Sequence, residues 1–112
     1  MPAALNNFRT TFADLTTSPS DVYTPPLGYS TVVLMAQVSN NGLDTIQISA
    51  GVVRGGNYTS LINGASVPIN DAITVLTGRL ILTFGDELRF TSSDDTSAQL
   101  TLSYLETLVT GN

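Results

Sequence analysis

Apolar and polar residues alternate along most of the chain, a pattern typical of half-buried β-strands. Clean alternation covers residues 46–52, 80–84, 87–91 and 100–104. No segment shows an apolar stripe at helical spacing, so we expect an all-β protein.

Residues 31–38 differ because both alternating sets of positions are apolar. Val32, Leu34, Ala36 and Val38 form one set, and Val33 and Met35 belong to the other. A strand with one face in water would not have this composition. We therefore expect Val33 and Met35 to contribute apolar surface outside the main core.

Turn-forming residues separate the alternating stretches at intervals of about 8 to 12 residues. They lie at Thr16–Ser20, Asn40–Gly42, Gly55–Asn57, Asn63–Gly64, Thr77–Gly78 and Gly85–Asp86. This spacing predicts an antiparallel β-sandwich of about eight strands, either a jelly roll or an Ig-like sandwich. A chain of 112 residues suits a single domain, and we expect residues 1–7 and 110–112 to form extended arms.

The residue types that are missing restrict the chemistry of the protein. The sequence has no His, Cys, Lys or Trp, and its four basic residues are all Arg. Ser-His and Cys-His pairs, Schiff bases, P-loops and metal sites built from Cys and His are therefore excluded. We expect no cofactor, no metal and no enzymatic activity.

Asp86 and Glu87 form the first of two pairs of adjacent carboxylates. Neighbouring side chains on an extended backbone point to opposite faces, so this pair cannot flank one substrate bond. Gly85-Asp86 instead fits a hairpin turn in which the Asp accepts backbone N–H groups. Glu87 then lies on the solvent side near Arg89.

Asp94 and Asp95 form the second pair, within the polar segment Ser93–Ser97. Their oxygens could bind Ca²⁺, but the segment lacks the ligand spacing of a calcium loop, and we interpret it as a solvated turn. A carboxylate-dependent hydrolase that uses all four acids is the remaining enzymatic alternative.

The charge balance limits the partners that the protein can bind. The net charge is −5, which disfavours binding to a nucleic-acid backbone. No signal-peptide pattern and no apolar run long enough to cross a bilayer are visible, so we expect neither nucleic-acid nor membrane partners.

Apolar residues make up 42% of the chain and charged residues only 12%, which suggests apolar surface beyond one core. The candidate subunit-interface residues are Val33, Met35, Leu105, Leu108 and Val109. One interpretation is a homo-oligomer, with a trimer as one candidate. The alternative is that the N-terminal segment covers this surface through Phe8 and Phe12.

The order of the strand and turn motifs resembles that of small virion structural proteins of tailed bacteriophages. The similar segments are Thr16–Pro26, Ser30–Asn40, Val53–Gly56, Val67–Ala72, Gly78–Leu88 and Leu102–Glu106. The resemblance implies a β-sandwich that is assembled into the virion in the host cytoplasm. It implies a capsid decoration (cement) protein or a neck, collar or tail component, with the major capsid protein or neck and tail proteins as partners.

A carbohydrate- or receptor-binding module of the virion is the main alternative function. Such modules stack a sugar on exposed aromatic rings, and Tyr23, Tyr29 and Tyr58 lie near predicted loops. The absence of Trp weakens this alternative.

Overall fold

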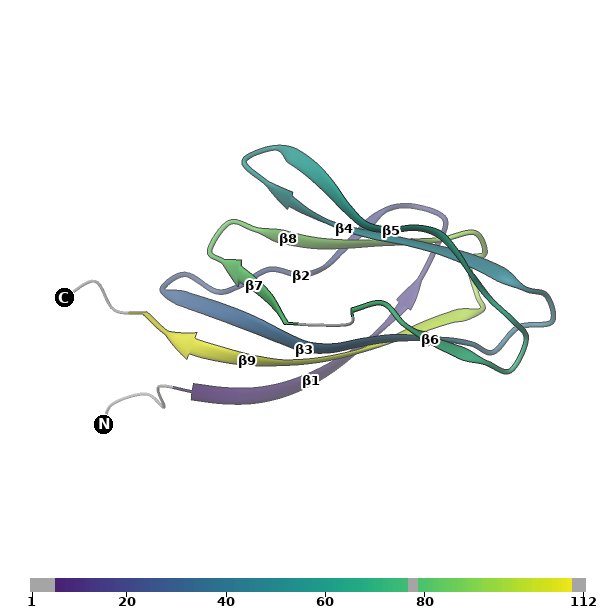
Figure 1. Ribbon diagram of the computed structural model, residues 1–112, viewed down its shortest axis with the longest axis horizontal. Coiled ribbons are helices and arrows are strands. Elements are labelled where there is room, and N and C mark those ends of the chain that lie inside the picture. Colours follow the sequence, from purple (N-terminus) through teal and green to yellow (C-terminus); the bar gives the residue numbers. More distant parts are fainter. Residues whose placement is uncertain (1–5, 77–78, 110–112) are drawn as a thin grey trace.

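Two antiparallel sheets pack face to face in the computed structural model, which describes residues 6–76 and 79–109 (Figure 1). The strands are β1 (Asn6–Leu15), β2 (Ser20–Tyr23), β3 (Tyr29–Asn40), β4 (Ile46–Arg54), β5 (Asn57–Val67), β6 (Ala72–Thr74), β7 (Leu80–Thr83), β8 (Glu87–Ser92) and β9 (Ala98–Leu108). The predicted antiparallel β-sandwich is confirmed.

The strand order is that of a jelly roll. Sheet A has the order β1-β9-β3-β6, with β7 also paired to β3, and sheet B has the order β2-β8-β4-β5. Because β6 pairs with residues 37–39 of β3 and β7 with residues 30–33, the two short strands form one interrupted strand. When β6 and β7 are counted as one strand, each sheet has four strands, and their order is that of an eight-stranded jelly roll.

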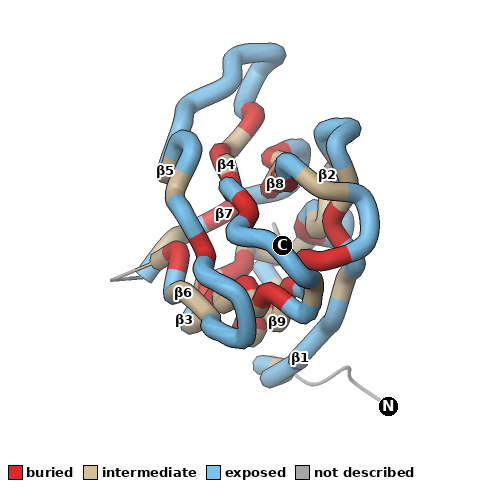
Figure 2. Tube along the Cα trace, turned by 90° about the vertical axis from the view of Figure 1, so that its right-hand side faces the viewer, coloured by how far each residue is buried: buried red, intermediate tan, exposed pale blue. Residues whose placement is uncertain are grey.

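The hydrophobic core fills the space between the two sheets (Figure 2). Its largest fully buried apolar side chains are Leu15, Val33, Val38, Leu82, Leu100 and Leu102 from sheet A and Ile46, Ile48, Val67, Leu88 and Phe90 from sheet B. The predicted inward alternation of β4, β8 and β9 is therefore correct at these positions.

A β-bulge in β3 reverses the prediction for Val33. The register of β3 against β9 shifts between Val33 and Met35, so one extra residue is inserted there. Val33 is consequently buried in the core, whereas Leu34 is 43% exposed. The expectation that Val33 lies outside the core is wrong.

A second irregularity replaces the turn predicted at Asn63-Gly64. Strand β5 continues through this dipeptide, and its register against β4 shifts between Ile48 and Ala50. Gly64 has a φ of 68°, which glycine adopts without a steric penalty, and its N–H donates to the Ser49 hydroxyl. The glycine therefore signals a bulge rather than the end of a strand.

The chain ends agree only in part with the predicted arms. Asn6 and Asn7 belong to β1 and pair with Thr107 and Glu106 of β9, so they are not part of an arm. Residues 1–5 and 110–112, like the predicted turn at 77–78, lie outside the described residues. The described residues contain no helix long and apolar enough to span a membrane.

Candidate functional site

The outer face of sheet A carries a row of apolar side chains that crosses four strands. Phe8 of β1 pairs with Leu105 of β9, Leu105 pairs with Val32 of β3, and Val32 pairs with Ile81 of β7. Phe8 is 77% exposed and Ile81 is 60% exposed. Leu34 and Met35 extend the row along β3, and we call these six residues the apolar face.

The outer face of sheet A is almost uncharged, unlike the outer face of sheet B. Its outward strand positions include one ionisable side chain, Asp14, and the exposed Arg79 lies just before β7. On sheet B, Arg89 pairs with Asp21 at 2.8 Å and lies 3.8 Å from Glu87, as expected for Glu87 and Arg89. Depletion of charge is a property that protein–protein interfaces show at their centres.

The five predicted interface residues separate into three groups. Met35 and Leu105 lie on the apolar face, and Val33 lies in the core. Leu108 is half-buried opposite Tyr29, and Val109 is 55% exposed at the end of the sheet. The structure thus brings two of the five residues together on one surface.

Phe8 and Phe12 do not cover the second face of the sandwich. Strand β1 pairs edge to edge with β9 instead of crossing the sheet, and the Phe12 side chain is 76% exposed. The alternative in which these two rings shield the apolar surface is therefore wrong. Both rings add to that surface.

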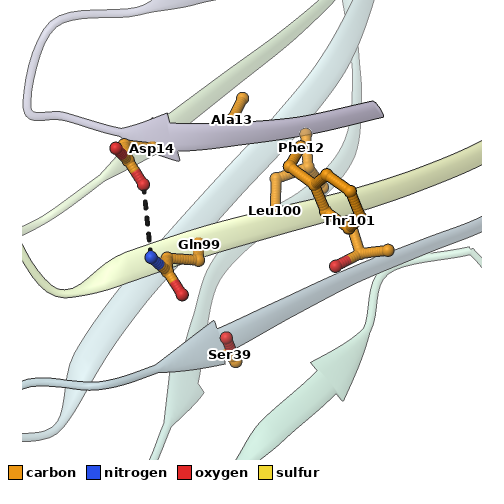
Figure 3. A pocket seen from close by; sticks show the side chains of 7 residues that line it. All are labelled: Phe12, Ala13, Asp14, Ser39, Gln99, Leu100 and Thr101. Atoms are coloured by element: carbon orange, nitrogen blue, oxygen red, sulfur yellow. Dashed lines mark hydrogen bonds between the residues drawn. The ribbon is translucent and has the colours of Figure 1, made fainter. Parts of the chain in front are cut away.

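A groove of about 400 Å³ lies beside Phe12 on the outer face of sheet A (Figure 3). Gln99 donates weakly to Asp14 at 3.5 Å and accepts a hydrogen bond from Asn41 at 2.7 Å. Ser39 and Thr101 add hydroxyl groups to the lining. An aromatic ring next to an amide, a carboxylate and hydroxyls can bind a polyhydroxylated ligand.

Glu106 forms a buried polar cluster that the sequence analysis missed. Arg9 donates to one carboxylate oxygen at 2.7 Å, and the Tyr23 hydroxyl donates to the other at 2.6 Å. Thr31 then donates to the Tyr23 oxygen at 2.7 Å, since the single Tyr23 proton is already used. Burial, followed by the hydrogen bond to Glu106, raises the pKa of Tyr23. The cluster joins β1, β3 and β9 to β2 of the opposite sheet.

Asp86 is a structural residue of the β7–β8 turn. Arg54 donates to both of its carboxylate oxygens, at 2.8 and 2.6 Å, and the Thr83 N–H donates at 2.8 Å. The Arg54 hydrogen bonds are the largest cause of a lowered Asp86 pKa. Gly85, with a φ of 94°, closes the turn, and Asp86 accepts a backbone N–H as predicted. The predicted hairpin is wrong, because β7 belongs to sheet A and β8 to sheet B, so the turn connects the two sheets.

Asp94 and Asp95 lie in the loop after β8 and bind the backbone. Asp94 accepts from the Thr96 N–H and Asp95 from the Thr17 N–H, each at 2.8 Å, and these bonds lower both carboxyl pKa values. The six-residue β8 separates them from Asp86 by about 20 Å. The four carboxylates therefore do not surround one substrate position.

The three candidate tyrosines have different surroundings. Tyr23 is committed to the Glu106 cluster, and Tyr29 lines a recess of about 240 Å³ with Phe84 and Val109. Tyr58 is 48% exposed and lines a separate groove of about 300 Å³ with Arg89. Tyr58 is the candidate that remains on an open surface.

The described residues contain no group of three or more His, Cys, Asp or Glu side chains that could hold a metal ion. No protein-family model matches the sequence, and no curated protein matches it significantly.

Proposed function

We propose that the protein is a non-enzymatic structural component of a bacteriophage virion and that it decorates the capsid as a cement protein. The observation behind the proposal is the apolar face on the nearly uncharged side of sheet A. Exposed apolar surface of this kind is typical of sites that bind other proteins.

Two further observations support this proposal. The strand order is that of a jelly roll, an architecture that occurs in viral capsid proteins and in lectins, although fold alone is an argument by analogy. The acidic side chains of the turns are occupied by structural hydrogen bonds, which favours a non-enzymatic role.

The direct test is immunogold electron microscopy of purified virions with antibodies against this chain. Label on the capsid supports decoration, and label on the neck or tail supports the alternative position within the virion. Virions that lack the chain by both labelling and mass spectrometry would refute the proposal.

A binding experiment tests the role of the apolar face. Purified protein is added to capsids that lack it, and the bound fraction is measured after sedimentation. We expect Ile81→Asp to reduce binding at least about tenfold, because the contact would bury an unpaired carboxylate. Leu43→Asp is the matched control, since Leu43 is 89% exposed outside the strands. Equal binding by both variants would exclude the apolar face as the contact.

A carbohydrate-binding module of the virion is the second candidate, favoured by the grooves beside Phe12 and Tyr58. A glycan array with the wild-type protein, Gln99→Ala and Tyr58→Ala tests it. Binding that one substitution abolishes would support this function and identify the groove. An array with no bound glycan would reject it.

A further inference from the structure

Strand β1 has a long free edge. It is the terminal strand of sheet A, and its ten residues pair with β9 without a register shift. Nine of the ten are not buried, and Figure 2 shows most of the strand exposed. The strand contains no Pro, Lys or bulge, which are devices that protect an edge from pairing with another chain. Its inward-pointing charge, Arg9, is paired with Glu106.

We propose that two copies of this chain pair antiparallel through β1, with a two-fold axis at Thr10. The two copies of sheet A, in each of which β6 and β7 lie end to end along β3, then become one continuous sheet. This inference goes beyond the proposed function, because it concerns the purified protein and does not depend on a capsid.

The register follows from the side chains of β1. In a two-fold antiparallel pair, opposite residues lie on the same face, so their numbers have the same parity. An axis at Thr10 places Phe8 of each copy opposite Phe12 of the other, so two aromatic pairs form. Cross-strand aromatic pairs stabilise such ladders. Asn6 lies opposite Asp14, where an amide can donate to a carboxylate.

Neighbouring registers are less favourable. An axis at Arg9 would place Phe8 opposite Thr10 and Phe12 opposite Asn6, so the aromatic pairs would be lost. An axis at Thr11 would place Phe8 opposite Asp14 and Phe12 opposite Thr10, so no aromatic pair would form. The self-complementarity of the Thr10 register is the reason to assign the edge to a second copy of this chain.

The inner side of β1 is compatible with this pairing. Arg9 lies opposite Thr11 of the second copy, and its charge is neutralised by Glu106 of its own chain at 2.7 Å. Asn7 lies opposite Ala13, so this side contributes no clash of charges. The pairing therefore preserves the Glu106 cluster.

Cysteine cross-linking tests the register, because the chain contains no native Cys. In a Thr10→Cys variant the two thiols face each other across the axis, at a Cα separation of about 4.5–5.5 Å, which a disulfide can bridge. We expect mild oxidation to convert most of the protein to a covalent dimer. Ser66→Cys, on the exposed edge strand β5, is the control that stays largely monomeric.

Sedimentation velocity of the variants completes the test. We expect wild-type protein to dimerise with concentration and Phe12→Lys to weaken the dimer at least about tenfold through lost aromatic pairs and added charge repulsion. Leu43→Lys should dimerise like the wild type. A wild-type monomer at all concentrations, a trimer, or equal cross-linking of Thr10→Cys and Ser66→Cys would overturn the proposal. Capsid binding by Ile81→Asp is measured separately, so the two proposals can fail independently.

Discussion

Strands β1 and β5 are both long edge strands, but they differ in the regularity of their pairing with the neighbouring strand. Each has one buried residue, its last, which is Leu15 in β1 and Val67 in β5. The register of β5 is broken twice against β4, whereas β1 is regular throughout. A bulged edge is a poor template for another strand, and a regular one is a good template. The comparison supports the proposal that a second copy of the chain pairs with β1.

Truncating the buried side chain at the end of β1, that of Leu15, should have the largest effect on stability. Leu15→Ala deletes a side chain that is 1% exposed, and we expect a loss of about 2–5 kcal/mol from the free energy of unfolding. Urea denaturation followed by circular dichroism measures it. Leu43→Ala should change stability by less than about 0.5 kcal/mol. A loss for Leu15→Ala below about 1 kcal/mol would contradict the role of Leu15 in fixing β1.

The second largest effect on stability concerns the Glu106 cluster, in which Arg9 of β1 is bound. Tyr23→Phe removes the hydroxyl that donates to Glu106, and a lost hydrogen bond to a charged group costs about 1.5–3 kcal/mol. The same denaturation experiment applies. Tyr29→Phe is the matched control, because the Tyr29 hydroxyl makes no hydrogen bond within the described part of the chain. Equal stability of the two variants would show that the cluster contributes little.

The ion pair between Arg54 and Asp86 joins the β4–β5 hairpin to the β7–β8 turn. Because Asp86 can be protonated, the contribution of this pair to stability depends on pH. The folded-state pKa of Asp86 is lowered, so its contribution is complete above the unfolded pKa of about 3.9 and is lost as pH falls through the folded pKa. We expect Asp86→Asn to cost about 1–2 kcal/mol at pH 7, since Arg54 is largely exposed and the pair is screened.

Denaturation at pH 7 and near pH 3 tests this dependence. The difference between wild type and Asp86→Asn should shrink at the lower pH. Glu87→Gln, next in sequence but on the outer face, serves as the control. A difference that stays constant across this range would contradict the assignment.

The smallest effect concerns the bulge that distinguishes β5 from β1. Gly64→Ala meets no atoms within 4 Å, so its cost of about 1 kcal/mol comes from the left-handed backbone alone. Thermal unfolding measures it, with Ser66→Ala as the control. A neutral Gly64→Ala would show that the bulge does not require glycine.

The sequence pattern predicts the fold class well because burial in a β-sandwich is periodic. Leu100, Leu102 and Tyr104 alternate, and all three are buried as expected. The bulge after Val33 could not be predicted, because Val33 and Leu34 are both apolar and either could face inward. Its position depends on the pairing with β9, which lies about seventy residues away in the chain.

The sequence indicates one member of the Glu106 cluster but not its partners. Glu106 continues the inward set of Leu102 and Tyr104, so its parity alone indicated a buried carboxylate. Its partners Arg9, Tyr23 and Thr31 come from three other strands, and only the strand order brings them together. The jelly-roll order depends on such long-range pairings and could not be ranked against an Ig-like order.

The position of β9 between β1 and β3 has a consequence for biosynthesis. During translation β1 and β3 emerge early, but the strand that must lie between them is made last of the nine. Sheet A therefore cannot close on the ribosome until residues 98–108 have been released, and the many distant pairings slow its closure further. In that interval the inward side chains of β1 and β3 that the closed sandwich buries, such as Leu15, Val33 and Val38, stay uncovered. A holdase chaperone should therefore improve the yield of folded protein.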